Sequence, residues 1–316
     1  MDRATRITFL AMVALLLVAP YFLYPVFLMK VLCFALFACA FNLLVGYVGL
    51  LSFGHAAFFG SAGYVTAYTV KAWGLPPELG ILLGAATGAA LGLVIGWLAI
   101  RRQGIYFAMI TLALSQIVFF YAVQAPWTGG EDGIQSVPRG HLFGIVDLHD
   151  PMAMYLTVLA LFLAGFLIVY RIIHSPFGQV LKAIRENEPR TISLGYETDR
   201  YKLIAFVLSA TLAGVAGGTK SLVFQLASLT DVQWQMSGEV VLMTLVGGLG
   251  TIFGPIVGAA VIVTMQNYLA EFGSWVTIIQ GAIFVVCVLT FRRGIVGEIM
   301  GRFGPKGAAP TGGGGH

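Results

Sequence analysis

Two ionisable side chains, His55 and Glu239, lie inside long apolar runs of this sequence. A titratable group costs free energy in such surroundings, so a functional role is the default hypothesis for each of them. Ser52 adds a hydroxyl group three residues before His55. An imidazole, a carboxylate and a hydroxyl can all hydrogen-bond to a polar molecule. We therefore expect Ser52, His55 and Glu239 to be candidates for lining a substrate path.

Each of the two ionisable groups also has a structural interpretation, which the sequence leaves open. Ser237 is a suitable N-cap, and a helix that begins there would hold Glu239 in its first turn, where the helix dipole stabilises a carboxylate. His55 would then be a neutral, hydrogen-bonded residue at a helix packing site. No carboxylate relay surrounds either group, so the sequence does not favour a proton-coupled pump.

The elements that position these groups must be membrane spans. The 316-residue chain is 58% hydrophobic and only 10% charged, with a mean hydropathy of +0.89. That is more apolar surface than one soluble core can bury, so we expect a polytopic membrane protein. The first run, Ile7 to Met29, is long enough to span a bilayer and lacks a small-x-small cleavage site, so a retained helix is expected. Three cysteines, Cys33, Cys39 and Cys287, lie in apolar runs without a CxxC pair and are expected to be small core residues.

Apolar runs of suitable length predict about ten spanning segments. They are Ile7 to Met29, Val31 to Leu50, Ser52 to Val70, Gly80 to Ile100, Ile105 to Gln124, Met152 to Tyr170, Leu203 to Phe224, Gly238 to Gly250, Pro255 to Leu269 and Trp275 to Phe291. No period-2 pattern with regular turns is present, so we predict an all-α transmembrane bundle rather than a barrel. Several runs are short, and eight crossings would satisfy the same topology.

The positions of lysine and arginine predict the orientation. The basic residues concentrate at Arg3 and Arg6, Arg101 and Arg102, 171–202, and Arg292, Arg293, Arg302 and Lys306. The 125–150 segment instead carries four acidic residues against the single Arg139. Both termini are therefore expected in the cytoplasm, and the 125–150 loop in the periplasm. The transmembrane domain is expected to cover residues 1–306, followed by a flexible Gly-rich tail, 307–316.

Two glycine-rich stretches interrupt the apolar runs, LLVGYVGLLSFGHAAFFGSAGY (43–64) and TLVGGLGTIFGPIVGAA (244–260). Interrupted helices in corresponding places of two halves point to a substrate pathway, because unwound backbone at membrane depth needs protein or water around it. Close packing of helices through small residues is the alternative. Gly84, Gly88, Gly92 and Gly96 form a clear small-residue stripe of that second kind.

The 175–202 segment is the charged exception within this apolar chain, since eight charged residues fall between Ile184 and Lys202. Asn187 can cap a helix, Pro189 suits its first turn, and Gly195 is a plausible left-handed terminator. We predict a short capped helix in water. A solvated loop is the alternative.

Three motifs resemble the LivM-type permease of bacterial branched-chain amino acid ABC importers. They are FNLLVGYVGLLSFGHAAFFG, SPFGQVLKAIRENEPRTISLGYETDRYKLIAFVLSATLAGVAGG and MSGEVVLMTLVGGLGTIFGPIVGA. The resemblance covers about Val31 to Glu298. It implies a subunit of the bacterial inner membrane that pairs with a homologous LivH-type permease, receives substrate from a periplasmic binding protein and is driven by two cytoplasmic ATPase subunits.

The resemblance also implies roles for individual residues. The segment 183–195 would be the ATPase-coupling segment, with Arg185, Glu186, Asn187, Glu188, Pro189 and Gly195 as its candidate residues. Helix N-termini at the breaks would offer N–H groups to an amino acid carboxylate, with Phe58 and Met243 as apolar neighbours.

No enzymatic function is expected, since the sequence contains no GxxxxGK[ST] phosphate loop and no catalytic or metal-ligating constellation. The chain would therefore need no cofactor of its own, with ATP bound by the partner subunits. The net charge of +4 is expected to meet anionic lipid and not nucleic acid. The sequence leaves open a urea, amide or aromatic acid substrate, and a stand-alone channel or secondary transporter. An ion-coupled secondary transporter should show paired charged residues inside the membrane, whereas this sequence shows Glu239 as an isolated glutamate.

Overall fold

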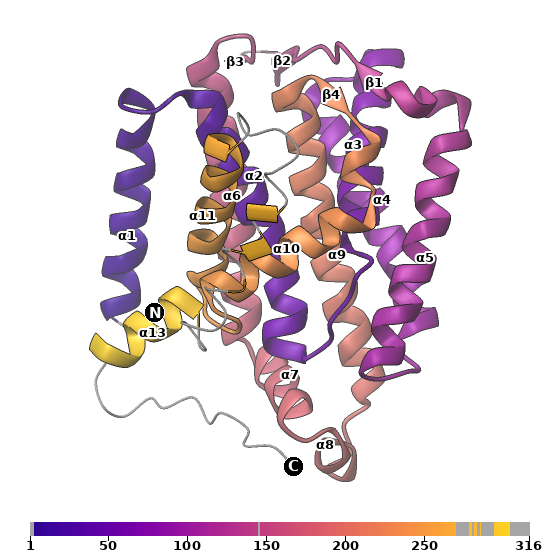
Figure 1. Cartoon of the computed structure of the whole chain (residues 1–316), viewed down its shortest axis with the longest axis vertical. Coiled ribbons are helices and arrows are strands. Elements are labelled where there is room, and N and C mark those ends of the chain that lie inside the picture. The colour runs from indigo at the N-terminus through magenta and orange to yellow at the C-terminus, as the bar shows by residue number, and fades with distance from the viewer. Residues whose placement is uncertain are drawn as a thin grey trace.

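The computed structural model describes residues 3–144, 146–269, 278–279, 281–282, 285 and 294–303. Most of its helices run along the long axis of the molecule, and two pairs of short strands lie at one end (Figure 1). The longer helices are α1 Arg3–Val18, α2 Pro25–Asn42, α3 His55–Ala72, α4 Pro77–Ala99, α5 Ile105–Gln124, α6 Pro151–His174, α9 Thr198–Phe224, α10 Trp234–Gly247 and α11 Gly254–Leu269. The expected helical bundle is confirmed.

The shorter elements connect and flank these helices. They are η1 Ala19–Tyr21, the π-helical η2 Leu43–Val48, η3 Pro126–Thr128, η4 Gly130–Asp132, β1 Ile134–Gln135, β2 His141–Leu142, β3 Val146–Asp147, α7 Pro176–Glu186, α8 Glu188–Ser193, β4 Leu226–Ala227, η5 Leu229–Asp231 and α13 Gly294–Phe303. Both strand pairs, β1 with β4 and β2 with β3, are antiparallel and two residues long.

Five helical stretches of the described part are long and apolar enough to cross a membrane: 25–48, α4, α5, α6 and α9. The 5–21 stretch and α11 are shorter apolar helices. The count of ten spans and the membrane side of the termini stay predictions. Outside the described residues lie most of the predicted 275–291 span, Cys287, Arg292, Arg293, Lys306 and the 307–316 tail.

The predicted first span, Ile7 to Met29, is wrong. The chain leaves α1 at Val18, turns through η1, and begins α2 at Pro25. Pro20 and Pro25 explain the turn, because proline cannot donate to a preceding helical carbonyl. A hydropathy profile does not reveal this turn, because the turn contains apolar residues such as Phe22. The side chains of Tyr21 and Phe22 are 79% and 82% exposed. Aromatic residues of this kind are typical of the membrane interface, where a turn belongs.

Small residues bring α3, α4 and α9 close together. A side-chain carbon on Gly88 would lie 2.6 Å from the Ala210 carbonyl oxygen, and one on Gly96 would lie 2.8 Å from the Phe206 ring. Gly84 likewise lies against α3, and Gly92 lies against α9. The predicted packing role of the small-residue stripe is therefore confirmed.

The two interrupted stretches are real breaks, and they meet. Gly49 ends η2 in the left-handed region (φ 83°), while Gly248 and Gly250 follow α10 at φ 120° and 72°. Asn42 bridges them, since its Nδ2 donates to the Thr251 carbonyl (2.9 Å) and its Oδ1 accepts from the Gly250 amide (3.0 Å). The breaks from the two halves of the chain thus form one packed unit.

The two ends of the bundle differ in charge. Helices α7 and α8 project from one end, and the strands of the 125–150 loop lie at the other (Figure 1). The loop between α4 and α5 lies at the α8 end, because Gln103 Nε2 donates to Glu188 Oε2 (2.9 Å). The basic 101–102 and 171–202 segments therefore share one end, and the acidic loop lies opposite. This arrangement agrees with the charge asymmetry on which the predicted topology rests.

Candidate functional site

The N-terminus of α3 is closed by hydroxyl groups from three elements. The bonds run from the Phe53 amide to Thr111 Oγ1 (3.2 Å), from the Gly54 amide to Ser52 Oγ (3.2 Å) and from the Ala56 amide to Ser237 Oγ (2.9 Å). These amides are the donors that a broken helix would offer to an anion, and the protein already uses them. At this break, therefore, these three amides are not free to bind a substrate carboxylate, and the role of the helix N-termini in binding stays a prediction.

Ser237 does not cap its own helix, contrary to prediction. Helix α10 begins at Trp234, so Ser237 lies inside it and instead receives the Ala56 amide of α3. Glu239 consequently lies in the second turn of α10. A first-turn cap therefore does not explain the carboxylate of Glu239.

His55 is fully buried where α2, α3 and α9 meet. The Ser209 hydroxyl donates to the Ala40 carbonyl (2.5 Å), so it must accept from His55 Nε2 at 2.9 Å. In the neutral imidazole this hydrogen bond places the proton on Nε2. Phe41 and Phe58 approach the imidazole edge-on, at centroid distances of 5.0 and 5.5 Å. The geometry favours the packing interpretation of His55 over the path interpretation, and Ser52 and Met243 are likewise buried.

Glu239 is the path candidate that the structure places near other polar side chains. It is half-buried, and its Oε2 accepts from Gln266 Nε2 of α11 at 3.0 Å. It also lies in electrostatic range of Lys30, Asp231 and Lys220. The expectation that Glu239 is isolated is therefore wrong.

Sequence reasoning missed three of these charges. Lys220 of α9 forms an ion pair with Asp231 of η5, and their side chains are only 15% and 8% exposed. Lys30 lies in the second turn of α2, and it was assigned to a loop because the first two spans were divided at that residue. The usable signal was the lysine inside the predicted 203–224 span.

The charged 175–202 segment folds as two short helices with the predicted caps. Asn187 Oδ1 accepts from the Arg190 amide at 3.0 Å, and Pro189 is the second residue of α8. Gly195 adopts φ 89°, and its amide donates to the Ile192 carbonyl (2.9 Å). The expected capped helix and its left-handed end are confirmed.

Three of the coupling candidates differ in their surroundings. Glu188 pairs with buried Lys202 and accepts from Thr198 Oγ1 (3.1 Å), so it holds α8 against α9. Arg185 turns toward the bundle, where its guanidinium donates to the Gly46 carbonyl of η2. Glu186, the last residue of α7, is exposed.

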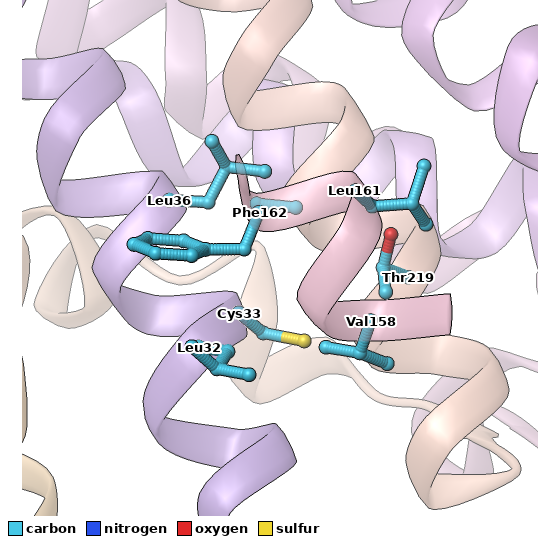
Figure 2. Close-up of a pocket in the computed structure, with 8 residues that line it drawn as sticks. Leu32, Cys33, Leu36, Val158, Leu161, Phe162 and Thr219 are labelled. Atoms are coloured by element: carbon cyan, nitrogen blue, oxygen red, sulfur yellow. The ribbon is translucent and has the colours of Figure 1, made fainter. Parts of the chain in front are cut away.

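The pocket between α2, α6 and α9 is a packing gap. Figure 2 shows its lining, in which Cys33 and Thr219 supply the polar atoms among apolar side chains. A water molecule does not fit into it. We assign no ligand to this pocket.

Comparison with known proteins places these features in a family. The family described as branched-chain amino acid transport system / permease component matches residues 25–288. The permease protein LivM of the high-affinity branched-chain amino acid transport system of Salmonella typhimurium is 27% identical over 278 residues, covering 81% of this chain and 65% of that protein. The chain thus spans about two thirds of LivM.

Two further relatives are also described as permease proteins. The ribose import permease protein RbsC of Bacillus subtilis is 27% identical over 237 residues, 70% of each chain. A probable branched-chain amino acid transport permease protein LivH of Methanocaldococcus jannaschii is 26% identical over 269 residues, covering 77% of this chain and 81% of that protein. No solved structure matches this chain.

Proposed function

The chain belongs to the family of branched-chain amino acid transport permeases, and from this premise we propose that it is the membrane-spanning permease subunit of an ABC importer. It passes leucine, isoleucine and valine from a periplasmic binding protein across the bacterial inner membrane. A homologous LivH-type permease completes the pathway, and two cytoplasmic ATPase subunits drive it. The family match over residues 25–288 carries this proposal.

Helices α7 and α8 are the proposed docking arm for an ATPase subunit. Ile192, Leu194 and Tyr196, on and just after α8, are 54%, 68% and 43% exposed. Apolar side chains exposed together next to charged ones are typical of a protein interface. The arm is also held firmly, because Glu188 ties α8 to buried Lys202.

Arg185 is the proposed mechanical link between this arm and the membrane helices. Its guanidinium donates to the Gly46 carbonyl. A side-chain carbon on Gly49 or Gly250 would lie 3.2 Å from Arg185 atoms, so this side chain contacts both interrupted stretches. A hollow of about 190 Å³, lined in part by Gly49 and Ile105, lies beside the first break. Movement of α7 would therefore reach both breaks through one side chain.

The substrate is tested in proteoliposomes that contain the complete importer and its binding protein. We expect ATP-dependent uptake of labelled leucine, and none of urea or ribose. Urea or ribose uptake without leucine uptake would refute the substrate assignment.

The link is tested with Arg185→Met in the same vesicles, with exposed Arg190→Met on α8 as the matched control. We expect the amount of ATPase subunit that co-purifies with Arg185→Met to stay unchanged. The number of leucine molecules transported per ATP hydrolysed should fall. An unchanged ratio would refute the link.

A further inference from the structure

An apolar hollow opens on the surface between the first break and the start of α5. Its volume is about 190 Å³, and every residue that lines it is glycine or aliphatic. The lining residues are Gly49, Leu50, Leu51, Gly104, Ile105 and Ala108. Leu51 and Ile105 are 37% and 75% exposed, so the hollow can be entered from outside. An apolar cavity of comparable size stays dry and binds hydrocarbon.

The surface around this hollow has the features of a membrane interface. Helix α5 lies at one side of the bundle (Figure 1), and it is long and apolar enough to cross a membrane. Tyr106, near the start of α5, and Trp97, near the end of α4, are 70% and 57% exposed. Exposed tyrosine and tryptophan are typical of the depth at which lipid headgroups meet acyl chains. The mouth of the hollow therefore lies where a phospholipid can enter it.

Two arginines, Arg101 and Arg102, precede the hollow in the loop between α4 and α5. Both are exposed, and neither forms an ion pair with any described residue. The Arg101 guanidinium lies 5.0 Å from the centre of the Trp97 ring, which holds it at the outer face of α4. Arg102 is two residues before Gly104, so its Cα lies within about 8 Å of the lining. Two unpaired cations thus lie beside the mouth of an apolar hollow.

The neighbouring contacts fix both walls of the hollow. On the α5 side, Gln103 donates to Glu188 at 2.9 Å, and Lys202 already compensates the Glu188 charge. On the other side, a side-chain carbon on Gly49 would lie 3.2 Å from the Arg185 Cγ atom. An occupant of the hollow therefore rests against the break that the docking arm reaches.

We propose that the hollow and the two arginines bind an anionic phospholipid, with Arg101 and Arg102 at its phosphate and part of one acyl chain in the hollow. Guanidinium groups form charge-assisted hydrogen bonds with phosphate oxygens. The predicted topology puts this end in the cytoplasm, and basic pockets at the cytoplasmic ends of membrane helices are typical sites for anionic headgroups. A free phosphate compound has no acyl chain for the hollow and is not the ligand. This inference goes beyond the proposed function and holds for any transported substrate.

The test uses the full-length permease in nanodiscs, alone and in the complete importer, with phosphatidylglycerol whose acyl chain carries a photoreactive diazirine. Phosphatidylcholine with the same acyl chain is the headgroup control. After illumination, peptide mass spectrometry measures adducts on residues 104–108 relative to adducts on exposed Leu93 and Val94 of α4. This ratio should be about tenfold higher with phosphatidylglycerol, the effect of two arginines on an anionic headgroup. An excess of glycerol 3-phosphate should leave it unchanged.

Two sets of variants separate the hollow from the arginines. Ala108→Phe fills the hollow, and Met109→Phe, at the exposed next residue of α5, is the matched control. Ala108→Phe should lower phosphatidylglycerol labelling of residues 104–108 about tenfold, while Met109→Phe should keep it.

The arginines are tested by the double variant Arg101→Gln/Arg102→Gln. The matched control is Arg190→Gln/Arg200→Gln, which removes two exposed arginines from the same end of the molecule. The first pair should lose the preference for phosphatidylglycerol, and the second should keep it. Because Arg101 and Arg102 are exposed loop residues, this test stands even where Ala108→Phe fails to accumulate.

Any of four results would overturn the site. Equal labelling by the two phospholipids would exclude a role of the arginines, and full labelling of Ala108→Phe would show that the hollow is not occupied. Displacement of the lipid by glycerol 3-phosphate would reduce the site to a phosphate site. Labelling that is present in the isolated permease and absent from the complete importer would assign this surface to the second permease subunit. None of these readouts uses leucine uptake, so each leaves the proposed function standing.

Discussion

Gly195 offers the sharpest test of the docking arm. It sits just after α8 at φ 89°, and a side-chain carbon built there would meet nothing within 4 Å. Gly195→Val therefore introduces no clash, and its whole effect is the backbone strain of a β-branched residue in the left-handed region, about 1–2 kcal/mol. Leaving that region would break the bonds from the Gly195 and Tyr196 amides to the Ile192 and Thr191 carbonyls.

A strain of this size changes the ratio of native to non-native α8 ends by about 5- to 30-fold. We expect leucine uptake and the amount of ATPase recovered with the permease to fall by up to that factor, while permease abundance in the membrane stays near normal. Gly195→Asn should restore most of the loss, because asparagine tolerates the left-handed region.

The matched control is Gly144→Val, at the opposite end of the molecule. Gly144 has φ 70° and likewise meets nothing within 4 Å. If both variants reduced ATPase recovery equally, general backbone strain would be the cause. Full recovery and uptake in Gly195→Val would refute the docking role of α7 and α8.

Two further predictions concern topology and packing. Single cysteines at exposed Gln135 and Ser193, in a background without native cysteines, should react with an impermeant thiol reagent from opposite sides of the membrane. Labelling of both from outside sealed cells would refute the orientation. Ser237→Ala should destabilise the protein by about 1–3 kcal/mol, because the buried Ala56 amide loses its acceptor. Thermal unfolding in detergent, with Ser193→Ala as the control, measures this loss, and equal midpoints would contradict it.

Local sequence signals predicted helix α8 and its two ends well. The cap at Asn187, the proline beside it and the glycine that ends α8 each act within a few residues, so the sequence determines them without reference to the rest of the chain. The glycine stripe of α4 was predictable for the same reason, since a spacing of four residues defines one helix face. The role of Ser237 was not predictable, because its hydrogen-bond partner is 181 residues away in sequence.

The position of Lys30 was missed because of one error in dividing the spans. The turn between α1 and α2 is itself apolar, so the hydropathy pattern placed the boundary at Lys30 and assigned that residue to a loop. With α2 beginning at Pro25, the same lysine lies half-buried in the second turn of that helix. Hydropathy locates a span but does not show which helices face each other, and the meaning of Lys30 depends on that. Glu239 read alone suggested a helix cap, whereas its partner in the structure is Gln266 of α11, a residue 27 positions away in sequence.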